Sequence, residues 1–155
     1  MINPIKALGA ISGLLFFRRQ DLGRATRVFL IASLIYLVLG VTIGLILTIH
    51  PGAIGGLMAM HAHINLLGWL SMMVFAVAYH VLPRFSGREL HSERLANTHV
   101  VLANAGLIGL IIAWPLSRLN LTPSVHLFFI AAALCYAAGA YLFVYNILRT
   151  ILGKN

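Results

Sequence analysis

Four long apolar runs, separated by short polar breaks, dominate this chain. They cover residues of about 28–49, 57–82, 99–114 and 123–152. An α-helix rises 1.5 Å per residue, so about 20 apolar residues cross the ~30 Å hydrocarbon core of a bilayer. The runs therefore predict four transmembrane helices, although the third only just reaches the necessary length. The fold class we expect is all-α, an integral membrane four-helix bundle, with residues 1–155 forming a single transmembrane domain.

Proline and capping residues suggest where these helices begin and end. Pro83 and Pro115 are expected to end the second and third helices, because proline lacks the backbone N–H that would continue a helix. Thr122 followed by Pro123 predicts a capped start for the fourth helix. Residues 84–98, the most polar stretch of the chain, are expected to form a loop.

The N-terminal segment, residues 1–24, differs from the four long runs. Its apolar part, residues 7–17, is too short to span a bilayer. It is followed by Arg18 and Arg19 instead of the small residues of a signal-peptide cleavage site. This pattern predicts an amphipathic segment lying at the inner face of the membrane, with both arginines near the lipid headgroups.

Composition and charge support a membrane protein and suggest its orientation. The chain is 61% hydrophobic and 9% charged, whereas a soluble domain carries roughly 25% charged residues. On one side of the predicted topology lie ten basic residues: Lys6, Arg18, Arg19, Arg24, Arg27, Arg84, Arg88, Arg94, Arg149 and Lys154. The other side has only Arg118. Basic residues concentrate on the cytoplasmic side. We therefore expect a bacterial or archaeal inner membrane protein with both termini cytoplasmic.

The net charge of +8 does not indicate nucleic-acid binding. The basic residues lie between apolar runs and form no patch interleaved with surface aromatic residues, which nucleic-acid recognition would require. The charge is better explained by the orientation of the helices in the membrane, so no nucleic-acid partner is expected.

Seven histidines in so apolar a chain are its main chemical signal, because an ionisable side chain inside a membrane is costly and often functional. His80, His91 and His99 flank the inner loop, where an interfacial position with a hydrated ring explains them. His50, beside Pro51, has the same simple explanation. For His126, in the first turn of the fourth run, both a structural and a ligand role remain open.

His61 and His63 lie about one turn inside the second apolar run. Two residues on a helix are separated by about 200°, so the rings point to nearly opposite sides and cannot both bind one metal ion from one helix. Each can serve a separate site, or one ring can meet a histidine from another helix. The two faces differ in character. The His61 face carries Asn65, Gly68, Met72 and Tyr79, and the His63 face carries Leu67, Leu70 and Val74.

An imidazole above an apolar stripe suits an iron porphyrin. Haem needs an axial nitrogen, apolar walls and a polar rim for its propionates. Arg118, with Trp114 nearby, lies on the correct side of the membrane to meet propionates. Gly40 and Gly44 in the first run would let a helix or a flat cofactor approach closely.

The residues from His61 to Trp69, HAHINLLGW, followed by AYHVLP at 78–83, resemble the catalytic subunit of haem-copper oxidases and nitric oxide reductases. One pattern of that family is a His-x-Asn-Leu-Leu-type run whose histidine binds the low-spin haem, and His63 falls on it. Another is His-x-His, in which one histidine binds the low-spin haem and the other the high-spin haem. His61 and His63 fall on this second pattern.

The resemblance also implies an architecture. The family's large subunit has twelve helices in three arcs of four, with the metal-binding helices second in each arc. This chain resembles one arc, so we expect three copies to form a homotrimer. Haem b would then lie between helices, with His61 of one protomer and His63 of the next as its axial ligands.

The chain also departs from the family pattern. It has no His-His pair for copper, and its only acidic residues are Asp21, Glu89 and Glu93, all near the inner surface. Bound copper and proton-pumping oxygen reduction are therefore less expected than haem and electron transfer.

The function these patterns favour is that of a b-type haem protein in the membrane. It would transfer electrons to or from quinone or a respiratory partner. Oxygen or nitric oxide chemistry would be added if an axial position is open, so enzymatic turnover is left undecided. Alternatives are a non-catalytic haem or gas sensor, an accessory oxidase subunit, a purely structural subunit, or a copper- or zinc-binding membrane protein. The last would use His50, His61, His63 and His126, because imidazole suits both metals.

Overall fold

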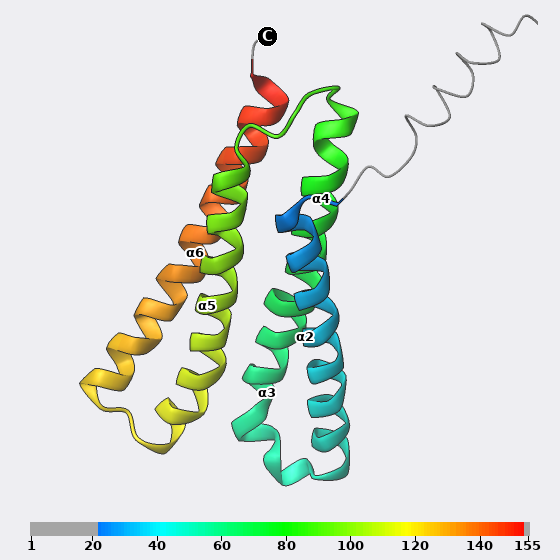
Figure 1. Ribbon diagram of the computed structural model, residues 1–155. Coiled ribbons are helices and arrows are strands. Elements are labelled where there is room, and N and C mark those ends of the chain that lie inside the picture. Colours follow the sequence, from blue (N-terminus) through cyan, green and yellow to red (C-terminus); the bar gives the residue numbers. More distant parts are fainter. Residues whose placement is uncertain (1–21, 154–155) are drawn as a thin grey trace, which may run out of the picture.

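The computed structural model describes residues 22–153, and this part of the chain is helical between short connections (Figure 1). Its elements are α2 (Arg24–Ile49), a 3-10 turn (Pro51–Ala53), α3 (Ile54–His63), a π-helical segment (Ile64–Ser71), α4 (Met72–Phe85), α5 (Glu93–Leu119) and α6 (Pro123–Leu152). Within residues 22–153, four helices are long and apolar enough to cross a membrane: Arg24–Ile49, Leu57–Phe85, Glu93–Leu119 and Pro123–Leu152. The prediction of an all-α chain with four such helices is confirmed. The amphipathic segment predicted at residues 1–24 falls almost entirely outside the described residues.

Two prolines lie inside helices instead of ending them. The second membrane helix continues through Pro83 to Phe85, and α5 continues through Pro115 to Leu119. The prediction that both helices stop at these prolines was wrong. Each proline removes a single backbone hydrogen bond close to a helix end. In an apolar medium the remaining bonds are retained, because unpaired backbone groups are costly there.

The helix α5 also begins earlier than expected. Its first residue is Glu93, and the Ser92 hydroxyl caps it by accepting a hydrogen bond from the backbone N–H of Leu95 at 3.2 Å. The prediction of a loop over 84–98 was therefore wrong for residues 84–85, which end α4, and for residues 93–98, whose polar side chains occupy the first turns of α5. The cap predicted at Thr122 is confirmed, since its hydroxyl accepts from the backbone N–H of Val125 at 3.3 Å.

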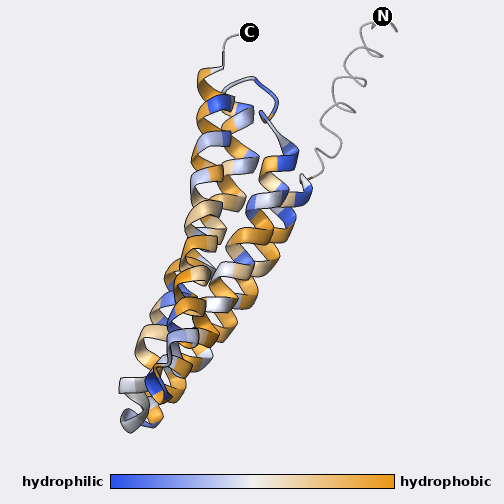
Figure 2. Ribbon diagram, turned by 90° about the vertical axis from the view of Figure 1, so that its left-hand side faces the viewer, coloured by the Kyte–Doolittle hydropathy of each residue, from blue (hydrophilic) through white to orange (hydrophobic). Residues whose placement is uncertain are grey.

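The helices pack as two antiparallel pairs placed side by side. In Figure 1, α5 lies along α6, and α2 lies along the continuous helix from α3 to α4. The helix α5 also contacts α2 and α3, so it joins the two pairs. The start of α2, the α4–α5 loop and the end of α6 meet at one end of the bundle, and hydrophilic residues gather toward the ends in Figure 2.

Glycines bring α5 and α6 into close contact. A Cβ atom on Gly106 would lie 2.5 Å from the backbone nitrogen of Tyr136, and one on Gly109 would lie 2.7 Å from the Cβ of Ala132. Real Cβ atoms essentially never approach so closely. The small residues of these two helices therefore serve helix packing, as small residues commonly do in membranes.

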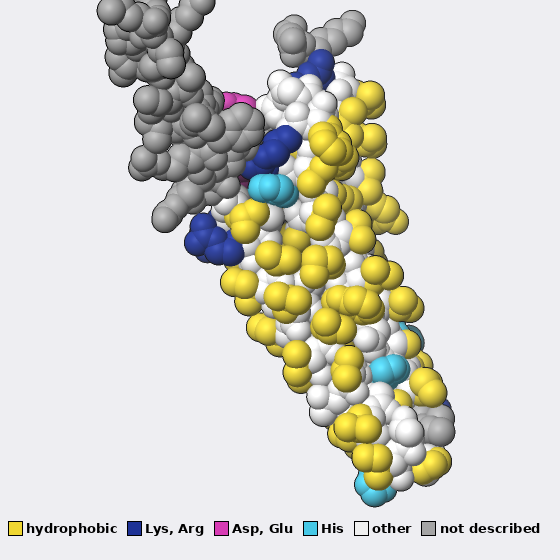
Figure 3. Space-filling model, turned by 90° about the vertical axis from the view of Figure 1, so that its right-hand side faces the viewer, with side chains coloured by type: hydrophobic (Ala, Val, Ile, Leu, Met, Phe, Trp, Pro, Cys, Tyr) yellow, Lys and Arg dark blue, Asp and Glu magenta, His cyan; other side chains and the backbone are white. Residues whose placement is uncertain are grey.

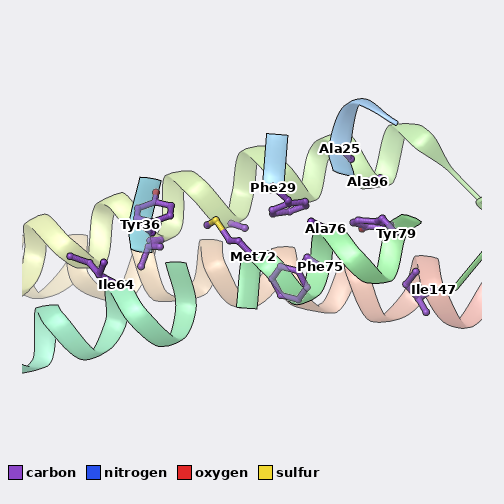
Figure 4. Packing of buried hydrophobic residues seen from close by; sticks show 12 residues of the cluster. Ala25, Phe29, Tyr36, Ile64, Met72, Phe75, Ala76, Tyr79, Ala96 and Ile147 are labelled. Atoms are coloured by element: carbon purple, nitrogen blue, oxygen red, sulfur yellow. The ribbon is translucent and has the colours of Figure 1, made fainter. Parts of the chain in front are cut away.

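A compact set of side chains fills the interior between the pairs. Phe29, Met72 and Leu107 are fully buried, and Figure 4 shows Phe29, Met72 and Phe75 close together between the helices. The outer faces carry the remaining apolar side chains, which cover most of the face shown in Figure 3. Outward apolar surface of this extent is expected where lipid or another protein chain surrounds the helices.

Candidate functional site

The second membrane helix changes its winding directly after the histidine pair. Residues Ile64–Ser71 form a π-helical segment. Two of its carbonyl oxygens accept hydrogen bonds from side chains: that of Leu66 from the Ser71 hydroxyl at 2.7 Å, and that of Leu67 from the Tyr136 hydroxyl at 3.0 Å. The sequence pattern did not reveal this segment. Such wide turns often occur at functional sites, because they alter which residues share a helix face.

The ring of His61 packs against α2. A Cβ atom on Gly44 would lie 3.0 Å from the Cε1 atom of His61, so the glycine makes room for the ring. The Asn65 amide donates to the His61 carbonyl oxygen at 2.9 Å and lies 3.3 Å from the Nδ1 atom of His61. Gly40 makes room for Asn65 in the same way, since its Cβ atom would lie 2.6 Å from the amide oxygen. The paired glycines of α2 thus hold His61 and Asn65 in place.

The ring of His63 turns toward α5 instead. Its Nδ1 atom lies 2.6 Å from the carbonyl oxygen of Ala59, and its centroid lies 6.1 Å from that of Trp114. A carbonyl oxygen can only accept, so Nδ1 carries the proton and Nε2 keeps a lone pair. The indole N–H of Trp114 is buried and has no hydrogen-bond partner within residues 22–153.

The two rings therefore contact different neighbours, α2 for His61 and α5 for His63, as expected from their separation of about 200°. Both histidines are only partly buried. Further along the same helix, Leu70 and Val74 are 48% and 51% exposed, so an apolar strip faces outward there.

The other predicted ligands are not gathered with this pair. Arg118, His50 and His126 are all exposed. Among the residues with described positions, no group of three or more His, Cys, Asp or Glu side chains could hold a metal ion. The alternative of a copper or zinc site at His50, His61, His63 and His126 therefore receives no support from the described residues and stays a prediction. The assignment of Arg118 to haem propionates stays a prediction.

His99 was misjudged from the sequence. It was expected to be hydrated at the interface, but it is 0% exposed. A hydrogen bond of 3.1 Å joins its Nδ1 atom to the Tyr79 hydroxyl, while Nε2 has no partner within the described part of the chain. The rings of Phe29 and Phe75 lie against it, with centroids 4.7 Å and 4.5 Å away.

The physical reason is the earlier start of α5. From Glu93 onward, Ala96, His99 and Ala103 share one helix face, which is the face directed into the bundle. The spacing of these residues at three and four positions could have revealed the burial. His99 is therefore a residue of the interior, and the prediction of a hydrated ring at the interface was wrong.

Comparison with known proteins finds partial similarity to two curated proteins. Over 49 residues the chain is 43% identical to the Cbb3-type cytochrome c oxidase subunit CcoN1 of Stutzerimonas stutzeri. These 49 aligned residues make up 31% of this chain and 10% of that protein. Over 49 residues it is 39% identical to the cytochrome c oxidase subunit 1 homolog of Agrobacterium tumefaciens (strain T37), covering 31% of this chain and 9% of that protein.

The chain thus spans about a tenth of the length of these relatives. No protein-family model and no solved structure matches it significantly. The similarity supports a relationship to haem-copper oxidase subunits over one segment of the chain.

Proposed function

We propose that this chain is a membrane-embedded b-type haem protein related to haem-copper oxidase subunits, with His61 and His63 as the candidate axial ligands. The observation that carries the proposal is the state of His63. Its Nδ1 atom donates to the carbonyl of Ala59 at 2.6 Å, which leaves the Nε2 lone pair for iron. Anchoring one ring nitrogen in this way is the usual means of orienting a metal-binding histidine.

The surroundings of His63 fit a porphyrin. The exposed side chains of Leu70 and Val74 provide an apolar surface along the same helix. The indole N–H of Trp114 is buried and has no hydrogen-bond partner within residues 22–153, and it would reach a carboxylate only after neighbouring side chains move. Arg118, one turn further along α5, adds a positive charge for the propionates. A bound haem would supply one-electron redox chemistry, and these residues would hold and orient it.

Asn65 has a supporting role in this proposal. Its amide packs against Gly40 of α2 beside His61, with 2.9 Å to the His61 carbonyl and 3.3 Å to the ring nitrogen Nδ1. An amide donor at this position pairs with an acceptor nitrogen of the His61 ring. Asn65 thereby limits the rotation of the His61 ring and directs its other edge.

The opposite directions of the two rings favour an assembly of several copies. One haem cannot be reached by both rings of one helix, whereas His61 of one protomer and His63 of the next could flank the same haem. A homotrimer with three four-helix arcs would supply this arrangement. The exposed apolar faces of α2 and α6, including Val38 and Leu134, leave surface for neighbouring copies or lipid.

The activity that follows is electron transfer in the inner membrane, with cytoplasmic termini and with quinone or a respiratory partner. Two histidine ligands would occupy both axial positions of the iron, so that electron transfer would be its only function. A single ligand would leave a position for oxygen or nitric oxide. Copper receives less support, because residues 22–153 of one chain contain no group of three or more His, Cys, Asp or Glu side chains that could hold a metal ion.

A reduced-minus-oxidised optical spectrum of the purified protein, with haem quantified as its pyridine haemochrome, tests this function. We expect a sharp α-band, about one haem per chain and loss of most haem in His63→Ala. His91→Ala is the matched control, since His91 is exposed on the α4–α5 loop, and it should keep its haem. A colourless protein after expression with added haem would refute the proposal, and equal loss in both variants would refute the ligand assignment.

Chemical cross-linking in mild detergent tests the assembly. We expect a ladder that ends at three copies, and loss of haem under conditions that dissociate it. Monomers that keep their haem would show that one chain binds the cofactor alone.

A further inference from the structure

A pocket of about 890 Å³ opens at the end of the bundle where α6 terminates. Its walls come from the α4–α5 loop and from the last turns of α6. The lining residues are Gly87, Arg88, Glu89, His91, Leu148, Arg149, Thr150, Leu152 and Gly153. Ligand pockets in proteins typically measure about 300–1,000 Å³, so this one is large enough for a small polar group.

One wall of the pocket is held rigidly. The Nη1 atom of Arg88 donates to the carbonyl oxygen of Ile151 at 2.9 Å and also to that of Gly153. These carbonyls at the end of α6 have no partner within the helix, so Arg88 serves as its cap. The backbone N–H of His91 donates to the Thr150 hydroxyl at 3.0 Å, which ties the loop to α6 a second time.

The α6 side of the pocket carries a second cation, Arg149. Arg149 is exposed, and its guanidinium makes no hydrogen bond or ion pair with any residue in the 22–153 range. Glu89 is the one acidic side chain among the lining residues, against Arg88 and Arg149. The pocket therefore favours an anion, and the planar guanidinium group is well suited to bind phosphate oxygens.

An apolar surface adjoins this basic pocket along α6. Leu148 and Tyr145 are 49% and 51% exposed, and Leu152 and Tyr141 are 72% and 75% exposed. The pocket is thus polar at the end of the bundle and continues into apolar side chains along a membrane helix. This is the polarity of a phospholipid, whose charged headgroup lies at the interface and whose acyl chains run along the helices.

We propose that this pocket binds an anionic phospholipid, with the phosphate held by Arg88 and Arg149 and the acyl chains lying along α6. Basic pockets between membrane helices on the cytoplasmic side commonly bind such headgroups. The site is at the opposite end of the bundle from α3, the helix that carries His61 and His63. The proposal therefore stands independently of haem binding.

Native mass spectrometry of the full chain, released from detergent with added phosphatidylglycerol or phosphatidylcholine, tests the proposal. We expect wild type to retain phosphatidylglycerol in clear preference. Arg149→Gln should lower that preference about fivefold, since one Arg near an anionic surface contributes roughly this factor. The matched control is Arg94→Gln, an exposed arginine in the first turn of α5 that does not line the pocket. It should behave like wild type.

Arg149→Gln is the primary variant because it breaks no hydrogen bond or ion pair within residues 22–153, whereas Arg88→Gln also removes the cap of α6. Competition with glycerol phosphate at equal concentration distinguishes a lipid headgroup from a free phosphate compound as the ligand of the pocket. If glycerol phosphate displaces the lipid completely, the site binds a free phosphate and the lipid assignment is wrong. An unchanged lipid preference in Arg149→Gln, or an equal loss in Arg94→Gln, would also overturn it.

Discussion

Replacing Gly106 with alanine should push α5 away from α6. The added Cβ atom would lie 2.5 Å from the backbone nitrogen of Tyr136 and 2.8 Å from its Cα and Cβ atoms. Ordinary contacts of this kind begin at 3.4 Å. The atoms in the way belong mainly to the backbone, so no change of side-chain rotamer relieves the overlap. The helices must separate by several tenths of an ångström or more.

The expected cost of Gly106→Ala follows from two effects. Overpacking in a well-packed interior costs about 1–3 kcal/mol. Displacement of Tyr136 would also weaken its hydrogen bond to the Leu67 carbonyl, now 3.0 Å, at about 0.5–1.5 kcal/mol. The greater helix propensity of alanine offsets up to about 1 kcal/mol. Taken together, these contributions lower the expected free energy of unfolding by about 0.5–4.5 kcal/mol.

Reversible unfolding in mixed micelles, with sodium dodecyl sulfate as denaturant and helicity followed by circular dichroism, measures this change. Gly55→Ala is the matched control, because a Cβ atom there would meet nothing within 4 Å. The control should unfold at the wild-type denaturant fraction or slightly above it. If both variants unfold together with wild type, the close contact between α5 and α6 inferred here is wrong.

Two further predictions concern the interior. Tyr79→Phe should destabilise the bundle by about 1–3 kcal/mol in the same unfolding assay, because it leaves both ring nitrogens of the buried His99 without a partner among residues 22–153. Unchanged stability would mean that the 3.1 Å hydrogen bond between Tyr79 and His99 contributes nothing. Gly40→Ala should displace the Asn65 side chain, whose amide oxygen would lie 2.6 Å from the new Cβ atom, and so shift the α-band or lower the haem content. A spectrum and haem content identical to wild type would show that Asn65 does not position the neighbouring histidine.

The sequence by itself determined the class of this protein. The length and apolarity of four runs predict four membrane-crossing helices, because the bilayer requires about 20 apolar residues with every backbone group paired within its helix. Local capping was also readable, since the hydrogen bond of Thr122 involves a residue only three positions away. The rotation of His61 relative to His63 followed from helix geometry alone.

Tertiary structure decided which side chains are buried and where the winding changes. His99 appeared interfacial by its place in the chain, yet rings from α2 and α4 enclose it, and sequence distance does not encode that packing. The π-helical segment after His63 is stabilised in part by the hydroxyl of Tyr136, which lies 69 residues from the carbonyl it binds. The local pattern of apolar residues is enough to specify a helix in a membrane, because a helix pairs its backbone N–H and C=O groups within its own segment. The direction of each face depends on neighbours that only the folded bundle brings together.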